Sequence, residues 1–151
     1  FTAGVTDLKP GEPVLLEGPY GNFSFTKMHR LHQIWVAGGI GITPFLAMAR
    51  SLDPILKYRV TLYYIIKTES EAVFLDELEA VSKQHEHFKV IPIFTHLQGR
   101  PTGTVIITGK RVKHTDVRIS GPAMMMNTTR RHVGVGGVPL HHIFTGHFIW
   151  S

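Results

Sequence analysis

Apolar and polar residues alternate in blocks that predict strands and helices in turn. A run at 33–37, which is apolar from Ile34 onward, leads through glycines into an amphipathic segment at 45–52. A second β-rich run at 59–66 precedes a segment at 71–85 with helical spacing, and a third strand is expected at 89–95. Unbroken apolar strands between amphipathic helices are typical of a parallel sheet that is buried on both faces.

The second half of the chain continues this alternation less regularly. Residues 98–113 are rich in glycine and proline and predict mostly loop, with a short element of undecided type at 105–107. A fourth strand is expected at 117–120, a helix at 123–133 and a final strand at 142–150. Strands alternating with helices indicate βαβ units, whose right-handed crossovers place helices on both faces of the sheet.

The expected helix at 71–85 carries its own end signals. Thr68 and Glu71 have the spacing of a capping box, in which a hydroxyl and a carboxylate bond free backbone amides. Acidic residues stand early in this segment and Lys83 stands late, as the helix dipole favours.

Residues 1–27 differ from the rest of the chain because glycine and proline interrupt them repeatedly. A short strand is expected at 14–17, between turns at 9–13 and 18–21. The stretch holds too little apolar mass to form a core alone. We therefore interpret 1–27 as the end of a preceding all-β unit and 28–151 as an α/β domain.

Composition supports a globular protein: of 151 residues, 43% are hydrophobic and 18% charged, and there is no cysteine. No apolar stretch reaches the length of a membrane span and no signal peptide is recognised, so a cytoplasmic protein is expected. The net charge of +5 is scattered, and its densest runs, at 110–113 and 130–131, lack interleaved aromatic residues. Nucleic-acid binding is therefore not expected. None of the ten histidines has a clear metal-ligand spacing, so no metal site is predicted.

The junction between the first strand and the first helix has the strongest chemical signal. Gly38, Gly39 and Gly41 would let a diphosphate approach the backbone amides at a positive helix end. Thr43 is expected to be the N-cap, and Pro44 to be the first helical residue, standing where the usual fingerprint has its third glycine. Alternatively, the turn needs glycine for its geometry alone. On the first interpretation, Gly41→Val abolishes nucleotide binding and leaves the fold intact.

Two further turns would lie at the same edge of a parallel sheet. Lys67 and Thr68 end the second strand, where a cation favours the 2′-phosphate of NADPH and an acid such as Glu69 favours NADH. We lean to NADPH and expect Lys67→Asp to shift the preference toward NADH. Gly121 and Pro122 follow the fourth strand, where a flat ring could pass close to the backbone. The open alternatives are that Lys67 and Glu69 are surface residues at a helix entry, and that Gly121 and Pro122 form an ordinary strand-ending turn.

Together these blocks resemble the ferredoxin–NADP⁺ reductase superfamily, and within it the bacterial ferric-reductase-like and related flavin reductases. The order and spacing of the blocks carry the resemblance over residues 10–151. The blocks are GPYG at 18–21, AGGIGITP at 37–44, SGPAM at 120–124 and FIW at 148–150.

The resemblance implies an FAD-binding β-barrel, of which 1–27 would be the last strands, followed by an NAD(P)H-binding domain. We expect a doubly wound, five-stranded parallel sheet in the order 3-2-1-4-5. The implied function is hydride transfer from the nicotinamide to FAD, with electrons passed on to an acceptor protein or metal chelate, and the isolated chain is expected to be inactive. The predicted cofactor-binding residues are Gly38, Gly39, Ile40, Gly41, Thr43, Pro44, Lys67, Thr68, Gly121, Pro122 and Met124, with Ser120 as the catalytic candidate.

Two positions depart from the family pattern. Many relatives have cysteine where this chain has Ser120, and many have a glutamate near their end where this chain reads TGHF at 145–148. The alternative function is therefore a non-catalytic, nucleotide-binding electron-transfer or regulatory subunit. A reductase on the cytoplasmic side of a membrane, with its transmembrane helices before residue 1, is a third possibility.

Overall fold

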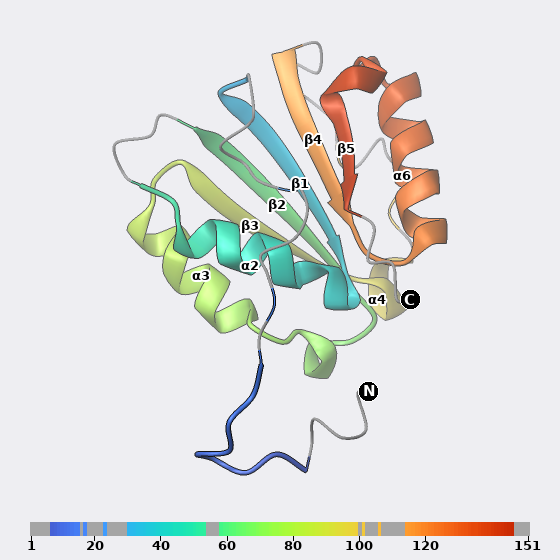
Figure 1. Cartoon of the computed structure of the whole chain (residues 1–151). Helices are drawn as coiled ribbons and strands as arrows, with labels where there is room; N and C mark the ends of the chain where they lie inside the picture. Colours follow the sequence, from blue (N-terminus) through green and yellow to red (C-terminus); the bar gives the residue numbers. More distant parts are fainter. Residues whose placement is uncertain are drawn as a thin grey trace.

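The computed structural model describes residues 7–15, 17, 23, 30–53, 58–99, 101, 106 and 114–146. Its centre is one five-stranded sheet with the strand order β3-β2-β1-β4-β5, in which every neighbouring pair is parallel (Figure 1). The predicted strand order is therefore confirmed. The strands are β1 (His32–Gly38), β2 (Arg59–Ile66), β3 (Phe88–Phe94), β4 (Thr115–Ser120) and β5 (Ile143–Gly146).

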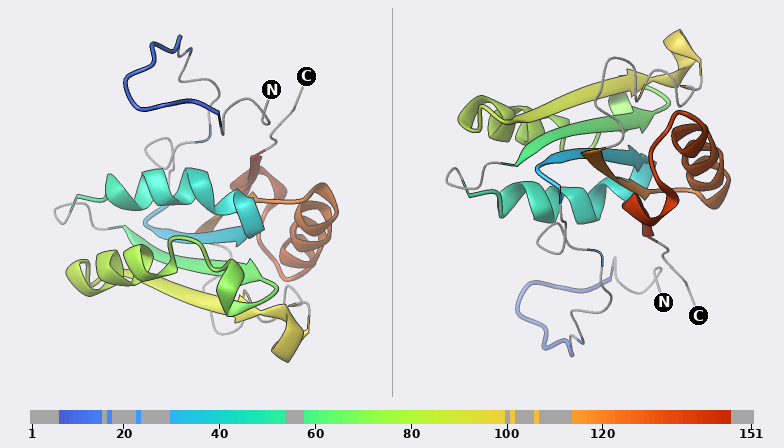
Figure 2. Two further views of the ribbon diagram at one scale, coloured as in Figure 1. Left: turned by 90° about the horizontal axis from the view of Figure 1, so that it is seen from below. Right: turned by 90° about the horizontal axis from the view of Figure 1, so that it is seen from above.

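Helices cover both faces of this sheet, as predicted. The α-helices are α2 (Thr43–Arg50), α3 (Leu75–Gln84), α4 (Thr95–Gln98) and α6 (Ala123–Val135). Short 3₁₀ turns are η2 (Gly39–Ile42), η3 (Glu69–Glu71) and η5 (Leu140–His142). Helices α2 and α3 pack on one face, and α6 packs on the other (Figures 1 and 2).

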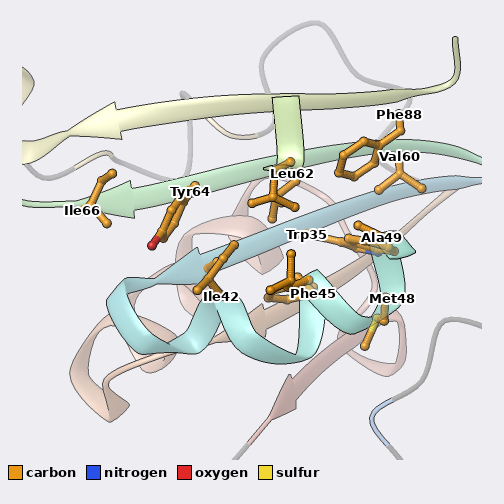
Figure 3. Packing of buried hydrophobic residues seen from close by; sticks show 13 residues of the cluster. Trp35, Ile42, Phe45, Met48, Ala49, Val60, Leu62, Tyr64, Ile66 and Phe88 are labelled. Carbon is orange, nitrogen blue, oxygen red and sulfur yellow. The ribbon is translucent and has the colours of Figure 1, made fainter. Parts of the chain in front are cut away.

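The two faces of the sheet build two separate cores. Trp35 of β1 faces α2, where its ring stacks on Phe45 with the ring centres 5.5 Å apart (Figure 3). The next residue, Val36, points to the other side and belongs to the cluster that includes Met126 of α6. Because both faces are buried, Ile34, Trp35, Val36 and Ala37 of β1 are all apolar, which explains this run in the sequence.

Strand β1 lies at the centre of the sheet, between β2 and β4. The chain leaves β1 through α2 on one face and leaves β4 through α6 on the other. The connections after these two neighbouring strands therefore diverge, and they leave a crevice at the carboxyl ends of β1 and β4, where ligands bind in doubly wound sheets.

The helix expected at 71–85 begins later than predicted. Helix α3 starts at Leu75, after Phe74 in a left-handed conformation with φ of 66°. The capping box is wrong: the Thr68 side chain makes no capping bond, and its hydroxyl lies 3.0 Å from the Ser70 hydroxyl. The buried Tyr64 hydroxyl donates to the Val73 carbonyl at 3.2 Å, which holds the preceding residues in a turn and delays the helix.

The strand expected at 14–17 is not formed by its described residues. Val14, Leu15 and Glu17 lie outside any strand, and Leu15 is 92% exposed. A strand is stable only when its backbone pairs with a neighbour, and no strand of the described part of the chain pairs with this stretch. The predicted turn at 18–21, the cationic run at 110–113 and residues 147–150 of the final strand lie outside the described residues.

Residue 23 nevertheless packs against the α/β domain. The Arg118 guanidinium of β4 lies between the ring of Phe23, at 5.0 Å, and that of Phe144 in β5, at 4.8 Å. Burial lowers the pKa of Arg118, and the charge of Asp116 raises it in part. Phe23 also meets Phe45 edge to face, with ring centres 5.5 Å apart. This aromatic pair covers part of the sheet beside α2.

Candidate nucleotide-binding site

A cleft of about 330 Å³ opens at the carboxyl edge of the sheet. It lies between the turn after β1, the ends of β2 and β3, and the first turns of α6, which is the crevice expected from the strand order. Its volume falls within the range of small-molecule sites. The lining residues are Gly38, Gly39, Ile65, Ile66, Lys67, Glu71, Thr95, Pro101, Pro122, Met124, Met125, Thr128 and Thr129.

Gly39 is the glycine at which a ligand can approach the backbone. It is exposed, its φ is +50°, and a Cβ placed there would meet nothing within 4 Å. It begins the 3₁₀ turn η2, which runs directly into α2. The amides in the first turn of a helix have no acceptors within the helix, so this corner can supply donors to an anion.

Gly41 makes a close backbone contact that the sequence does not predict. A Cβ at this position would collide with the Ser120 carbonyl oxygen, and it would lie 2.5 Å from the Ser120 carbonyl carbon and 2.6 Å from the Gly121 nitrogen. Gly41 is therefore required because the turn after β1 crosses directly over the end of β4. The expectation that Gly41→Val leaves the fold intact is contradicted by this geometry.

Gly38 and Gly121 allow a second close approach, next to the cleft. A Cβ on Gly38 would collide with the Met125 sulfur, and a Cβ on Gly121 would lie 3.0 Å from the Gly38 carbonyl oxygen. Met125 thus fills the space between the two turns. Its neighbour Met124, which was predicted from the sequence to bind the cofactor, lines the cleft but is 73% exposed.

Thr43 and Pro44 belong to the helix rather than to the cleft. Thr43 is the first residue of α2 and has helical backbone angles, so it is not the predicted N-cap. Its hydroxyl donates to the Ile40 carbonyl at 3.2 Å. Pro44 is the second residue of α2 and not, as was predicted, the first, but in this first turn its missing amide still costs no hydrogen bond. Ile40 is 78% exposed and, like Thr43 and Pro44, is not among the residues that line the cleft.

The cleft is lined by two opposite charges that follow β2. Lys67 and Glu71 both line the cleft, together with Thr95 from the end of β3. The Glu71 amide donates to the Thr68 carbonyl at 3.2 Å, and this bond holds the turn that carries the carboxylate. Thr68 itself is not among the lining residues. Glu71, which was predicted only as a capping residue, is thus brought to the site.

The sequence profile of the oxidoreductase NAD-binding domain family matches residues 35–131, a range that includes the glycine turn and most of α6. The chain belongs to this family.

Curated relatives of this NAD-binding domain include reductases. It is 31% identical over 135 residues to sulfhydrogenase 1 subunit gamma of Pyrococcus furiosus, covering 82% of this chain and 46% of that protein. It is 30% identical over 152 residues to NADH-cytochrome b5 reductase 1 of Candida glabrata, covering 89% of this chain and 52% of that protein. The chain spans about half the length of these curated relatives.

Solved structures share the fold of this NAD-binding domain. The flavohemoglobin of Malassezia yamatoensis, with bound FAD and heme, has a TM-score of 0.74 at 25% identity, covering 85% of this chain and 35% of that chain. The CS-b5R domains of human Ncb5or, in the NAD⁺ form, have a TM-score of 0.77 at 23% identity, covering 96% and 45%.

Within this NAD-binding domain, Ser120 lies beside the cleft but does not line it. The residue is fully buried, and its hydroxyl has no hydrogen-bond partner among the described residues. The described residues also contain no cluster of three or more side chains that could hold a metal ion, and none of their helices is long and apolar enough to cross a membrane.

Proposed function

We propose that this chain is the NAD(P)H-binding part of a flavin-dependent oxidoreductase that passes electrons on to a further acceptor. In the proposed reaction the nucleotide donates a hydride to an FAD, which is held by a domain that includes residues 1–27. The observation that carries the proposal is the cleft at the carboxyl ends of β1 and β4, which Gly39 lines. The family membership and the reductase names of the relatives support the same function.

The chemistry of the lining orients the nucleotide in this proposal. The diphosphate lies against Gly39 and the start of η2, where a side chain would otherwise block access to the backbone. The nicotinamide ring lies beside Pro122 and Met125, whose apolar surfaces suit a flat ring and exclude water. The adenosine ribose then reaches Lys67 at the end of β2, as in other dinucleotide-binding sheets.

In this proposal FAD is held by the domain that includes residues 1–27. The exposed apolar residues of the first described stretch, Leu8, Val14 and Leu15, are consistent with packing inside such a domain. The catalytic role of Ser120 remains a prediction, because its hydroxyl is buried and does not line the cleft.

The charges at the end of β2 determine the coenzyme preference in this proposal. A 2′-phosphate brought to this end of the cleft is attracted by Lys67 and repelled by Glu71. Removing the Lys67 charge should therefore shift the preference toward NADH, and removing the Glu71 charge should shift it toward NADPH. Because both side chains are exposed, each shift should be only about twofold to fivefold in affinity.

The test is calorimetric titration of the purified protein with NADH and with NADPH. Lys67→Gln should weaken NADPH binding relative to NADH, and Glu71→Gln should strengthen it. Lys89→Gln and Glu79→Gln remove the same charges from exposed positions that do not line the cleft, and they should leave the ratio unchanged. If the wild-type protein binds neither nucleotide, the proposed function is wrong. If both nucleotides bind but the ratio of NADPH to NADH affinity is unchanged in Lys67→Gln and Glu71→Gln, these two charges do not determine the coenzyme preference.

A further inference from the structure

The main-chain carbonyl of Lys67 accepts two hydrogen bonds from a single residue. The His96 backbone amide donates to it at 3.2 Å, and Nδ1 of the His96 ring lies 2.7 Å from the same oxygen. Because a carbonyl oxygen can only accept, Nδ1 must carry the hydrogen in this contact. His96 is exposed and does not line the cleft, so it has no direct place in the site described above.

The backbone bond lies just beyond the paired part of β2 and β3. The last registered pair of these strands is Ile66 with Phe94, and the bond from His96 to Lys67 joins the segments that follow it. Ladder bonds at the end of a sheet open easily because fewer neighbouring bonds hold them. The imidazole adds a second donor at the point where the ladder ends.

The single turn α4 holds His96 in this position. It starts at Thr95, directly after β3, and ends at Gln98; the amide of the next residue, Gly99, whose φ is +71°, donates to the Thr95 carbonyl at 3.0 Å. His96 is bonded to Lys67 and directly follows Thr95, and both Lys67 and Thr95 line the cleft. His96 therefore ties together two strand ends that form one wall of the site.

We propose that His96 is a positioning residue of the nucleotide site. Its ring locks the end of β2 against the end of β3, so that Lys67 and Thr95 hold the adenosine end of NAD(P)H at a fixed separation. This role rests on the proposed function, since it concerns the nucleotide that the cleft takes up. It predicts that His96 affects the adenosine half of the nucleotide and not the nicotinamide half.

The experiment compares His96→Ala with His96→Asn in the purified protein. The amide nitrogen of asparagine can occupy the position of Nδ1, so His96→Asn should keep the bond that His96→Ala removes. His87→Ala is the matched control, because His87 is an exposed histidine at the amino edge of the sheet, away from the cleft. Affinities for NADH, ADP-ribose and nicotinamide mononucleotide are measured by titration or competition, and thermal unfolding is followed in parallel.

We expect His96→Ala to weaken NADH and ADP-ribose roughly threefold to tenfold, because the loosened strand end must be ordered again when the nucleotide binds. The thermal midpoint of His96→Ala should fall by only a few degrees, the effect of losing about one hydrogen bond. Nicotinamide mononucleotide affinity should stay at the wild-type value, and His96→Asn and His87→Ala should bind like wild type. Equal ADP-ribose affinity in wild type and His96→Ala would overturn the role of His96 and leave the proposed function intact. Equal losses of ADP-ribose affinity in His96→Ala and His96→Asn would also overturn the role of His96. So would equal losses of affinity for ADP-ribose and for nicotinamide mononucleotide in His96→Ala. A wild-type protein that binds no NADH would overturn both.

Discussion

Replacing Gly41 by alanine tests whether the turn after β1 is built around a backbone contact. The new Cβ would lie 2.5 Å from the Ser120 carbonyl carbon, whereas ordinary contacts begin at 3.4 Å, so the two main chains must separate by the difference of 0.9 Å. Overpacking of this kind costs about 1–3 kcal/mol. The β1–β4 pairing ends at Ala37 and Ser120, next to the collision, and weakening its last hydrogen bond adds about 1 kcal/mol. The expected loss in unfolding free energy is therefore about 2–4 kcal/mol.

Urea unfolding measures this loss, and the slope of free energy against urea should not change if the native state stays compact. The matched control is Gly39→Ala, in the same turn. There the Cβ meets no atom within 4 Å, so the expected cost is only that of a left-handed alanine, about 1–2 kcal/mol. The added methyl group would lie on the cleft wall, so Gly39→Ala should lose more free energy of NADH binding than free energy of unfolding. A Gly41→Ala variant within about 0.5 kcal/mol of wild type would refute the backbone-contact explanation.

Two further predictions concern charged groups away from the cleft. Buried Asp116 accepts bonds from the His142 ring at 2.6 Å and the Arg30 amide at 3.2 Å, so Asp116→Ala should cost about 3–5 kcal/mol in urea unfolding, and a loss below about 1 kcal/mol would contradict this. The hydrogen bond from Arg50 lowers the pKa of Glu77, so the stability that this pair adds is present above the ordinary glutamate pKa and is lost as the pH falls through the lowered value. Arg50→Gln should therefore be less stable than wild type at neutral pH and equal to it in strong acid, and a difference that persists in acid would show that the carboxylate is not its source.

The strands of the sheet could be predicted from the sequence because their cause is local, whereas their order was implied only by the family resemblance. The run at 33–37 is apolar from Ile34 to Ala37, and burial on both faces of the sheet explains such a run. Element ends were less predictable. Helix α3 starts at Leu75 rather than at 71 because Tyr64, on a neighbouring strand, bonds to Val73 and holds the intervening turn. The end of that helix depends on a contact that no local pattern contains.

The candidate site shows the same division. Gly38, Gly39, Lys67, Pro122 and Met124 were predicted from motifs, and all five line the cleft. The sequence did not reveal four further lining residues, which reach the cleft from α4 and α6 without a motif of their own: Thr95, Met125, Thr128 and Thr129. Glu71 could have been predicted as an acidic residue shortly after the second strand, but the pattern was interpreted as a capping box.

The sequence alone determined the five strands of the α/β domain, that they run parallel, and which strand-to-helix turn is free of side chains, because apolar runs and glycines act through their immediate neighbours. Only the tertiary structure decided what each glycine is for. Gly39 and Gly41 are equivalent in the motif, yet one faces open space and the other faces the backbone of β4. That distinction depends on how closely two strands approach, and strands that are distant in the chain meet only when the whole sheet forms.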